Sequence, residues 1–355
     1  MGSQLSTLSS QLPRRSRGGF TLIELIVATA ITAVLAGVMV AIVANVSGFW
    51  GRTSGRLSAE SQARFILDQL ALDLQAARYR DDGGVWLAAT IPANTGNTGL
   101  WNTTGAVTNA LKPANNAGSL QGIATGALDQ ARFGIAGTWL RFFTTKRGAN
   151  TANQPATLSA PVAVGYQIVR RSITGADNRQ PVDRRYLLHR AEVRPARTSA
   201  TSTRNGALET GFDFAVTAYA PNSGNGVQTG DPAEIRYPTL NSVIGENVID
   251  FGVRLYVRDA GAADGLRRVF PATNTTTSYL ARTPPNQPGA TDPFPEVADV
   301  MVRVLTDEGA ALIAGYEAGR LTAPQGVTAQ AYWWQLALAN SQVLSRRIVI
   351  NGGTL

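Results

Sequence analysis

The sequence predicts an α+β protein, in which a long N-terminal helix packs on an antiparallel β-sheet domain with long loops. Residues 25–50 contain no Asp, Glu, Lys or Arg, which predicts an apolar helix embedded in a membrane. Residues 51–80 repeat small and aliphatic side chains at helical spacing, which predicts an amphipathic continuation of that helix. Residues 81–355 alternate β-branched and aromatic segments with stretches rich in Gly, Asn, Thr and Pro, which is typical of an extracytoplasmic, β-rich globular domain with surface loops.

The apolar half of the helix, residues 20–50, is long enough to cross a membrane. Its uncharged part would span about 39 Å as an α-helix, against a hydrocarbon core of about 30 Å. The segment that precedes it carries Arg14, Arg15 and Arg17 and no acidic residue. Since basic flanks stay on the cytoplasmic side, we expect a single-pass protein of the bacterial inner membrane, with its C-terminal domain in the periplasm or at the cell exterior.

The junction before the helix places two glycines ahead of the apolar stretch. An ordinary secretory signal is cut after its apolar stretch, at a small-residue site. Here a cut after Gly19 would remove residues 1–19 as a basic leader and leave Phe20 at the mature N-terminus. Glu24 lies near the start of the helix, where a carboxylate is costly and indicates a functional partner. The junction reads Arg14-Arg15-Ser16-Arg17-Gly18-Gly19-Phe20-Thr21-Leu22-Ile23-Glu24-Leu25.

This junction resembles the type IV prepilin signal. The resemblance implies that a prepilin peptidase cleaves between Gly19 and Phe20, that the new amine of Phe20 is N-methylated, and that Glu24 pairs with this amine in a neighbouring subunit. It implies a minor pilin or pseudopilin and no enzyme. An inner-membrane assembly platform would move the subunit from membrane lipid into a type IV pilus or a type II secretion-like filament, among other pilin subunits. The alternative for Glu24 is a carboxylate that merely reaches the headgroup boundary.

Later segments resemble particular members of this family. The run Asp73-Leu74-Gln75-Ala76-Ala77 is similar to the end of the helix in J-type pseudopilins of type II secretion and in PilW-like minor pilins. Residues 246–251 and 345–350 resemble a strand entry and the terminal strand of the same group. The overall layout also resembles minor pilins encoded in verrucomicrobial gene cassettes. Because subunits at the filament tip often lack the carboxylate that Glu24 provides, the resemblance implies a place below the tip.

The amphipathic half of the helix, residues 51–80, has an apolar stripe, and we expect the sheet to pack against this stripe and bury it. Arg64, Asp68, Asp73 and Arg78 fall largely on its other faces, and two aspartates and two glycines after residue 80 are expected to end it. The stripe consists of Ala63, Ile66, Leu67, Leu70, Leu74 and Ala77.

The remaining chain is expected to form an antiparallel sheet with two short helices near its end. By their β-branched and aromatic content, the predicted strands are residues 138–145, 162–173, 185–193, 213–220, 248–257, 297–305 and 346–350. The predicted helices are residues 307–318 and 329–340. The predicted loops are residues 90–132, 194–208, 221–238 and 271–295.

The candidate chemical groups are few. The chain has no cysteine and a single histidine, His189, which by itself predicts neither a zinc site nor a catalytic triad. Residues 259–265 are expected to form a hairpin turn and not a calcium loop. We expect no cofactor, with loop calcium at Asp292, Glu296 and Asp299 as the alternative. Tyr332, Trp333 and Trp334 are expected to fill the core, and the alternative is a ligand-binding surface.

The charge leaves two alternatives within the filament class. The formal net charge is +8, and loss of the leader's three arginines leaves 8 − 3 = +5. Such a body attracts nucleic acid, so a DNA-binding minor subunit is one alternative, although a composition biased toward Arg, Ala and Gly explains the charge equally. An adhesive subunit that uses the Gly/Asn/Thr loops is the second. A membrane-anchored extracytoplasmic enzyme is the alternative outside that class.

Overall fold

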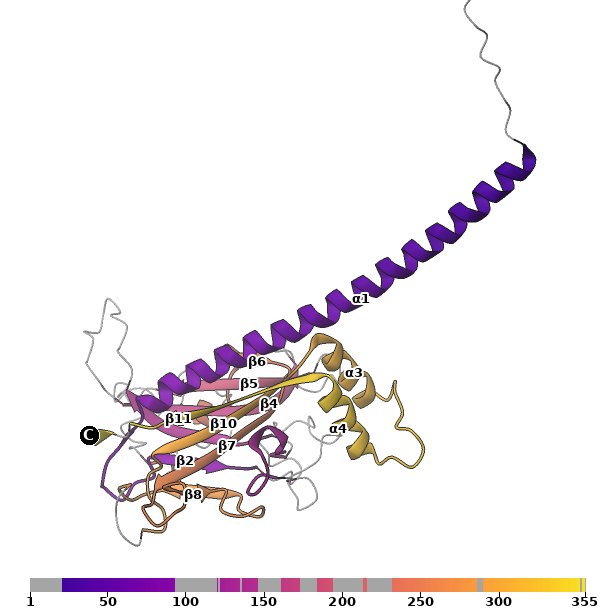
Figure 1. The fold of residues 1–355 in the computed structure, drawn as a ribbon. Coiled ribbons are helices and arrows are strands. Elements are labelled where there is room, and N and C mark those ends of the chain that lie inside the picture. The colour runs from indigo at the N-terminus through magenta and orange to yellow at the C-terminus, as the bar shows by residue number, and fades with distance from the viewer. Residues whose placement is uncertain are drawn as a thin grey trace, which may run out of the picture. The chain divides into compact units, whose positions relative to one another are not determined.

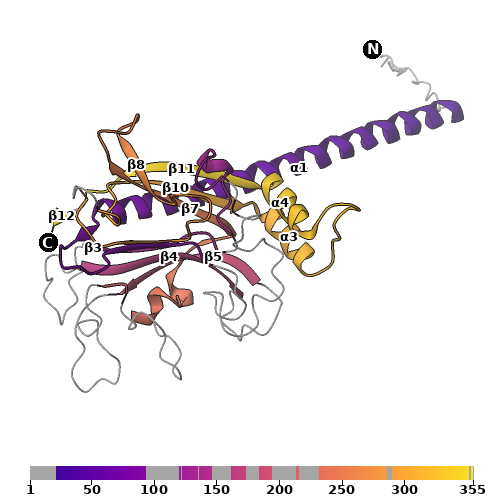
Figure 2. The same cartoon turned by 90° about the horizontal axis from the view of Figure 1, so that it is seen from below.

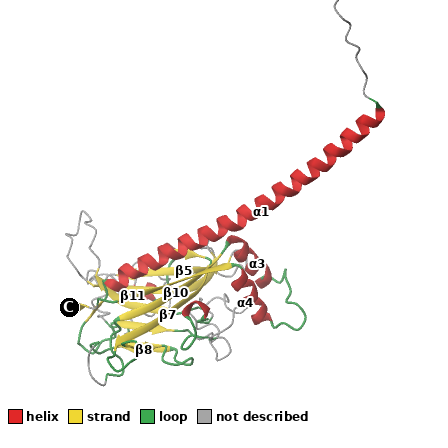
Figure 3. Cartoon of the chain, in the orientation of Figure 1, coloured by secondary structure: helices red, strands yellow, loops and turns green. Residues whose placement is uncertain are grey.

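The computed structural model describes residues 21–92, 120, 122–134, 136–145, 161–172, 184–193, 213–215, 232–285, 290–351 and 353–354. The chain divides into two compact units, Met1–Gly51 and Arg52–Leu355. Figure 1 shows the fold from the N-terminus to the C-terminus, and Figure 3 shows its helices and strands. The long helix and the antiparallel sheets confirm the predicted α+β class.

The first helix, α1, spans Leu22–Gln75 and therefore begins in the first unit and ends in the second. It ends five residues earlier than the sequence predicts, because residues of β3 (Trp139–Thr145) donate hydrogen bonds to the carbonyl groups at its C-terminal end. The Thr144 hydroxyl donates to the Asp73 carbonyl oxygen at 2.8 Å, and the Thr145 N–H donates to the Ala76 carbonyl oxygen at 3.1 Å. The chain then bridges to β3 at Ala77 and continues as a short strand, β1 (Arg78–Tyr79).

A six-stranded antiparallel sheet forms one layer of the second unit. Its strand order is β6-β5-β4-β3-β2-β9. The strands are β2 (Leu87–Thr90), β3 (Trp139–Thr145), β4 (Pro161–Ser172), β5 (Arg184–Val193), β6 (Val243–Glu246) and β9 (Ser278–Ala281). Two 3₁₀ turns, η4 (Pro232–Ile235) and η5 (Leu240–Ser242), lie against β4 and β5 on the face away from α1, as Figure 2 shows.

A four-stranded antiparallel sheet forms the other layer, in the order β11-β10-β7-β8. Its strands are β7 (Val248–Arg258), β8 (Leu266–Phe270), β10 (Val297–Leu305) and β11 (Ser341–Val349). The helices α3 (Asp307–Glu317) and α4 (Ala329–Ala339) connect β10 to β11. A third 3₁₀ turn, η2 (Leu128–Gln130), precedes β3, and the last strand, β12 (Gly353–Thr354), pairs in parallel with β1.

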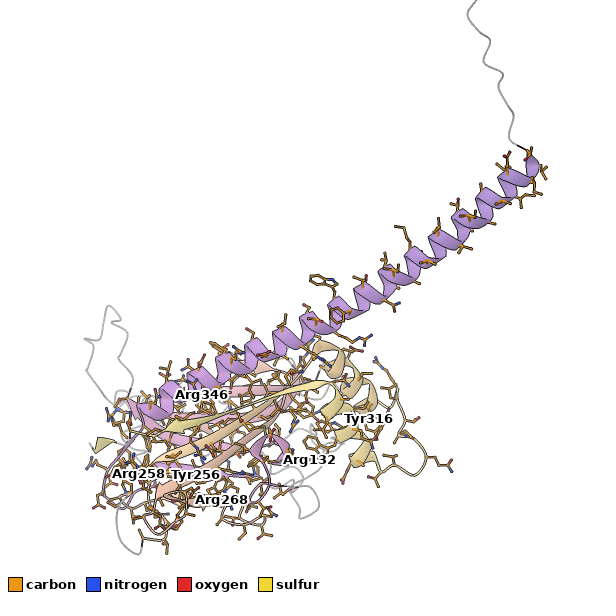
Figure 4. All side chains as sticks on the ribbon, in the orientation of Figure 1. Arg132, Tyr256, Arg258, Arg268, Tyr316 and Arg346 are labelled. Atoms are coloured by element: carbon orange, nitrogen blue, oxygen red, sulfur yellow. The ribbon has the colours of Figure 1, made fainter. Side chains whose placement is uncertain are left out.

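The two sheets pack face to face, and the second half of α1 closes one side between them. The rings of Tyr166 in β4 and Phe251 in β7 lie 6.3 Å apart between the sheets. At the edge of one sheet, the side-chain amide of Gln62 in α1 bonds to the backbone of Glu246 in β6. In the orientation that gives both amide atoms a partner, its nitrogen donates to the Glu246 carbonyl oxygen and its oxygen accepts a hydrogen bond from the Glu246 N–H. At the edge of the other, Arg346 in β11 donates to Asp68 at 2.5 Å, and Figure 4 labels Arg346 beside α1.

Both faces of β7 are buried, which the sequence did not predict. One face lies in the core between the two sheets, and the other is covered by residues 122–134. Arg254 donates to the carbonyl oxygens of Ile123 and Gly126, at 2.8 and 2.7 Å. Phe133 packs so closely on Gly252 that a Cβ there would lie 2.1 Å from the ring.

Six of the seven predicted strands correspond to β3, β4, β5, β7, β10 and β11, and the two predicted helices correspond to α3 and α4. Residues 213–215 of the remaining predicted strand form a turn, and residues 216–220 lie outside the described residues. The strands β1, β2, β6, β8, β9 and β12 were not predicted, and β9 lies inside the expected loop 271–295.

Candidate assembly site

The start of α1 is a capping box formed by Thr21 and Glu24. The Glu24 carboxylate accepts hydrogen bonds from the backbone N–H and the hydroxyl of Thr21, both at 3.0 Å, and the Glu24 N–H donates to the Thr21 hydroxyl at 3.3 Å. This reciprocal pair satisfies donors that a helix start otherwise leaves free. The sequence shows the pattern directly, as Thr-x-x-Glu before an apolar run, but the prediction for Glu24 considered only its charge.

The side chains from Leu22 to Trp50 are exposed in the isolated chain. This part of α1 is long and apolar enough to cross a membrane. Its polar side chains are satisfied locally, since the hydroxyl of Thr29 donates to the Ile26 carbonyl oxygen and that of Thr32 to the Ala28 carbonyl oxygen. An apolar helix with its own hydroxyl groups bonded can lie in lipid or among other apolar helices.

The other end of α1 is held by a buried carboxylate, Asp73. Arg190 donates to both Asp73 oxygens, at 2.6 and 2.9 Å, and the Tyr166 hydroxyl donates at 2.5 Å. Burial, followed by the charge of Asp73, raises the pKa of Tyr166 well above its ordinary value, so this hydroxyl stays a donor. The sequence placed Asp73 on another face than the apolar stripe, and this was wrong, because Asp73 faces β4 and β5.

A second buried carboxylate, Glu317 at the end of α3, joins the C-terminal helices to the same sheet. Arg170 donates to it from two nitrogens, at 2.9 and 2.5 Å, and the Tyr186 hydroxyl donates at 2.5 Å. The indole N–H of Trp333 donates at 3.0 Å. Trp333 and Trp334 are buried in the core, as predicted, and Tyr332 is partly buried against it.

The remaining candidate groups are structural. His189 is buried, and its Nδ1 lies 3.1 Å from the Thr239 carbonyl oxygen and 3.2 Å from the Ser242 hydroxyl. Burial, with a smaller contribution from Arg171, lowers the pKa of His189 to about 3, so the ring is neutral. Residues 259–265 form the predicted turn between β7 and β8, where the Asp259 N–H donates to the Gly265 carbonyl oxygen at 2.9 Å.

No group of three or more His, Asp or Glu side chains that could hold a metal ion occurs within the described part of the chain. Of the residues considered for loop calcium, Glu296 accepts the Arg258 N–H at 2.8 Å, and Asp299 accepts two hydrogen bonds from Arg347 at 2.6 and 2.7 Å. Their carboxylates are therefore engaged by arginines and do not converge.

Of the predicted assembly residues, the structure places Glu24 alone. Gly19, Phe20 and the leader arginines Arg14, Arg15 and Arg17 lie outside the described residues. The described helix begins at Leu22, directly after these positions, with its capping box intact.

Comparison with known proteins finds similarity to a protein family and to a solved structure. Residues 14–43 match the family described as the prokaryotic N-terminal methylation motif. A type IV-like pilin from Thermus thermophilus aligns with 82% of this chain and 94% of its own length, at 10% identity and a TM-score of 0.27. That TM-score is too low to establish a common fold. No curated protein matches the chain.

Proposed function

Because residues 14–43 carry the N-terminal methylation motif of prokaryotic pilins, we propose that this type IV pilin-like chain is a minor pilin or pseudopilin. Prepilin peptidase cleaves it after Gly19, and the amine of Phe20 is methylated. The subunit waits in the inner membrane with its C-terminal unit outside the cytoplasm. An assembly platform then moves it into a type IV pilus or a type II secretion-like filament. The motif points to a structural subunit and not to an enzyme.

One observation carries the proposal: the motif, residues 14–43, runs into a long apolar helix that begins at Leu22 and whose side chains up to Trp50 are exposed in the isolated chain. In lipid these side chains are surrounded by acyl chains, and in a filament by the helices of other subunits. The hydrophobic cost of exposing them to water, about 25 cal/mol for each Å², keeps the subunit in one of these two environments.

Cleavage is tested by intact mass and N-terminal sequencing of the protein from its native membrane. A mature chain that begins at Phe20, with about 14 Da added for one methyl group, supports the prepilin pathway. Gly19→Val should abolish processing while the protein still reaches the membrane. A chain that begins at Met1 in cells that contain the peptidase would contradict the proposal and leave a plain membrane anchor.

The role of Glu24 is tested by separating its charge from its capping bonds. Glu24→Gln keeps a side chain that completes a capping box but removes the charge, whereas Glu24→Val removes both. Thr21→Ala is the matched control, because it removes one capping partner and leaves the carboxylate. If the charge pairs with a neighbouring amine, both Glu24 variants are cleaved normally but enter the filament poorly, and Thr21→Ala enters it normally.

Two outcomes contradict that role. Normal incorporation of Glu24→Gln together with poor incorporation of Glu24→Val would show that Glu24 acts as a helix cap only. Normal incorporation of both would show that neither property is needed. The measurement is the ratio of sheared filament protein to membrane-bound protein on an immunoblot, with the wild-type chain beside each variant.

A further inference from the structure

The face of the six-stranded sheet that points away from α1 carries a half-buried arginine, Arg141. Along β3, the side chain of Thr144 points toward α1, where it bonds to the Asp73 carbonyl oxygen. Arg141 lies three residues earlier and therefore points to the opposite face. Its neighbours across the sheet are small, Ala88 in β2 and Gly165 in β4, which leaves room for the long side chain between them.

Arg141 has contacts but no counter-charge. Its guanidinium lies 3.5 Å from the centre of the Trp139 ring and donates to the Thr90 hydroxyl at 2.8 Å. Its Nε is buried without a hydrogen-bond partner. No carboxylate pairs with it among the residues that the structure describes, whereas Arg170 is paired with Glu317, and Arg190 with Asp73 and Glu192.

The charged group that acts on Arg141 is a second arginine. Burial, and then the charge of Arg236, lowers the pKa of Arg141 to about 9. Arg236 belongs to the segment between η4 and η5, and the sheet fixes this segment through its backbone. Gln167 donates to the Arg236 carbonyl oxygen at 3.2 Å, and the Trp139 indole N–H donates to the Ile235 carbonyl oxygen at 3.2 Å.

Gly165 in β4 allows the segment between η4 and η5 to lie close to the sheet. A Cβ at Gly165 would lie 3.2 Å from the Ile235 carbonyl oxygen, so a larger residue in β4 would push the segment away from the sheet. The half-buried side chain of Arg236 lies against the ring of Tyr237, at 5.6 Å from its centre. Arg141 and Arg236 are thus held on the same face of the sheet, Arg141 by β3 and Arg236 by a segment whose backbone is bonded to Trp139 in β3 and Gln167 in β4.

Two like charges in a partly desolvated place destabilise the fold unless an anion lies between them. Guanidinium groups present several N–H donors in a plane, which suits the oxygens of a phosphate group, and a hydroxyl adds a further donor. We propose that Arg141, Arg236 and Thr90 form a binding site for a phosphate-class oxyanion on this face of the sheet.

The proposal is tested by calorimetric titration of the full chain in detergent with inorganic phosphate, at constant ionic strength set with chloride. Saturable binding at one site per chain is expected. Arg141→Gln and Arg236→Gln should each weaken it at least about tenfold, the size expected for loss of one charged hydrogen bond. Arg185→Gln is the matched control, because Arg185 lies on the same face of the sheet but is paired with Glu246 at 2.9 Å.

Thermal unfolding gives a second readout, because a ligand that binds only the folded state raises its melting temperature. Phosphate should stabilise the wild-type chain and the Arg185→Gln control, and it should stabilise Arg141→Gln less. Arg236 lies on a segment that connects two 3₁₀ turns and not in a strand, so we expect Arg236→Gln to fold. This variant therefore tests the site even if Arg141→Gln does not fold.

Absence of saturable binding would overturn the proposal, and so would equal stabilisation of all variants, which is the general effect of phosphate on proteins. Competition by glycerol 3-phosphate would identify a phosphate end group as a ligand, and failure to compete would identify the free ion. The titration uses unassembled protein and does not depend on cleavage at Gly19, so its result is separate from that of the proposed function.

Discussion

Replacing Asp73 with asparagine should loosen the second half of α1 from the sheets. Asp73 is 7% exposed, and it accepts hydrogen bonds from Arg190 and Tyr166, which come from two different strands. Asparagine keeps the shape of the side chain but lacks the charge and one acceptor oxygen. Arg190 then remains buried with Glu192, at 2.7 Å, as its remaining carboxylate.

The cost follows from this geometry. Removing one partner of a buried ion pair costs about 3–5 kcal/mol, because the other charge stays in a poorly solvated place. Glu192 still faces Arg190, so we expect the lower end of that range, about 3 kcal/mol. For a domain of this size, that corresponds to a melting temperature about 6 °C lower.

The assay is thermal unfolding of the full chain in detergent, followed by near-ultraviolet circular dichroism of the buried tryptophans. The matched control is Asp68→Asn in the same helix. Asp68 also bonds an arginine, Arg346 at 2.5 Å, but its side chain is 67% exposed. Exposed pairs contribute at most about 1 kcal/mol, so the control should unfold within about 2 °C of wild type.

The reasoning fails if Asp73→Asn unfolds at the same temperature as Asp68→Asn. The apolar stripe would then hold α1 without the buried ion pair. A double-mutant cycle with Arg190→Gln locates the effect, because residues that interact directly give non-additive losses. Additive losses would mean that Asp73 and Arg190 stabilise the fold independently, against the contact that the structure shows.

Three further predictions concern other buried groups. His189 takes up a proton at pH 6.5 in the unfolded chain but near pH 3 in the folded one, so stability falls as the pH drops below 6.5, by about 1.4 kcal/mol for each unit. Urea unfolding should therefore show that wild type loses about 2 kcal/mol more than His189→Gln between pH 7 and pH 5, and equal losses would contradict a buried neutral ring. Gly137→Ala should unfold at a much lower temperature than wild type in a thermal scan. Residue 137 has a φ of +62°, and its Cβ would lie 2.7 Å from the Phe251 carbonyl oxygen. The control is Gly265→Ala, which has a φ of +70° but open space around it and should cost only about 1 kcal/mol. Glu317→Gln should release α3 and α4, so that trypsin cleaves after Arg320 faster than in wild type, and an unchanged rate would show that the four donors on this carboxylate do not hold the helices in place.

The parts of the fold that the sequence predicts are those with a strong local pattern. The helix α1 follows from an uncharged apolar run and a stripe at helical spacing, and β7 and β10 follow from their dense β-branched residues. The strands β2 and β9 read Leu-Ala-Ala-Thr and Ser-Tyr-Leu-Ala, and such short segments become strands because they pair with each other. Strand formation there depends on neighbours in the sheet and not on local propensity.

The functional and buried charged groups also differ in whether a local sequence pattern predicts them. The methylation motif and the Thr-x-x-Glu capping pattern are local and can be read directly from residues 14–43. The partners of Asp73 lie 93 and 117 residues further along the chain, and no local pattern indicates that Tyr166 and Arg190 will meet it. The counter-charge of a buried acid therefore needs the folded structure, and so does the absence of one beside Arg141.

The two carboxylates of α1 differ in how firmly they are bound, and this difference fits the proposed function. Glu24 is exposed and bonded to the uncharged Thr21, three residues before it, so it can exchange that partner for a cation without disturbing the fold. Asp73 is buried and bonded to two strands, so it cannot. Variants at Glu24 should thus change filament incorporation at an unchanged melting temperature, whereas variants at Asp73 should lower the melting temperature and reduce incorporation only as far as they reduce folded subunit. A Glu24 variant that lowered the melting temperature of the C-terminal unit would contradict this separation.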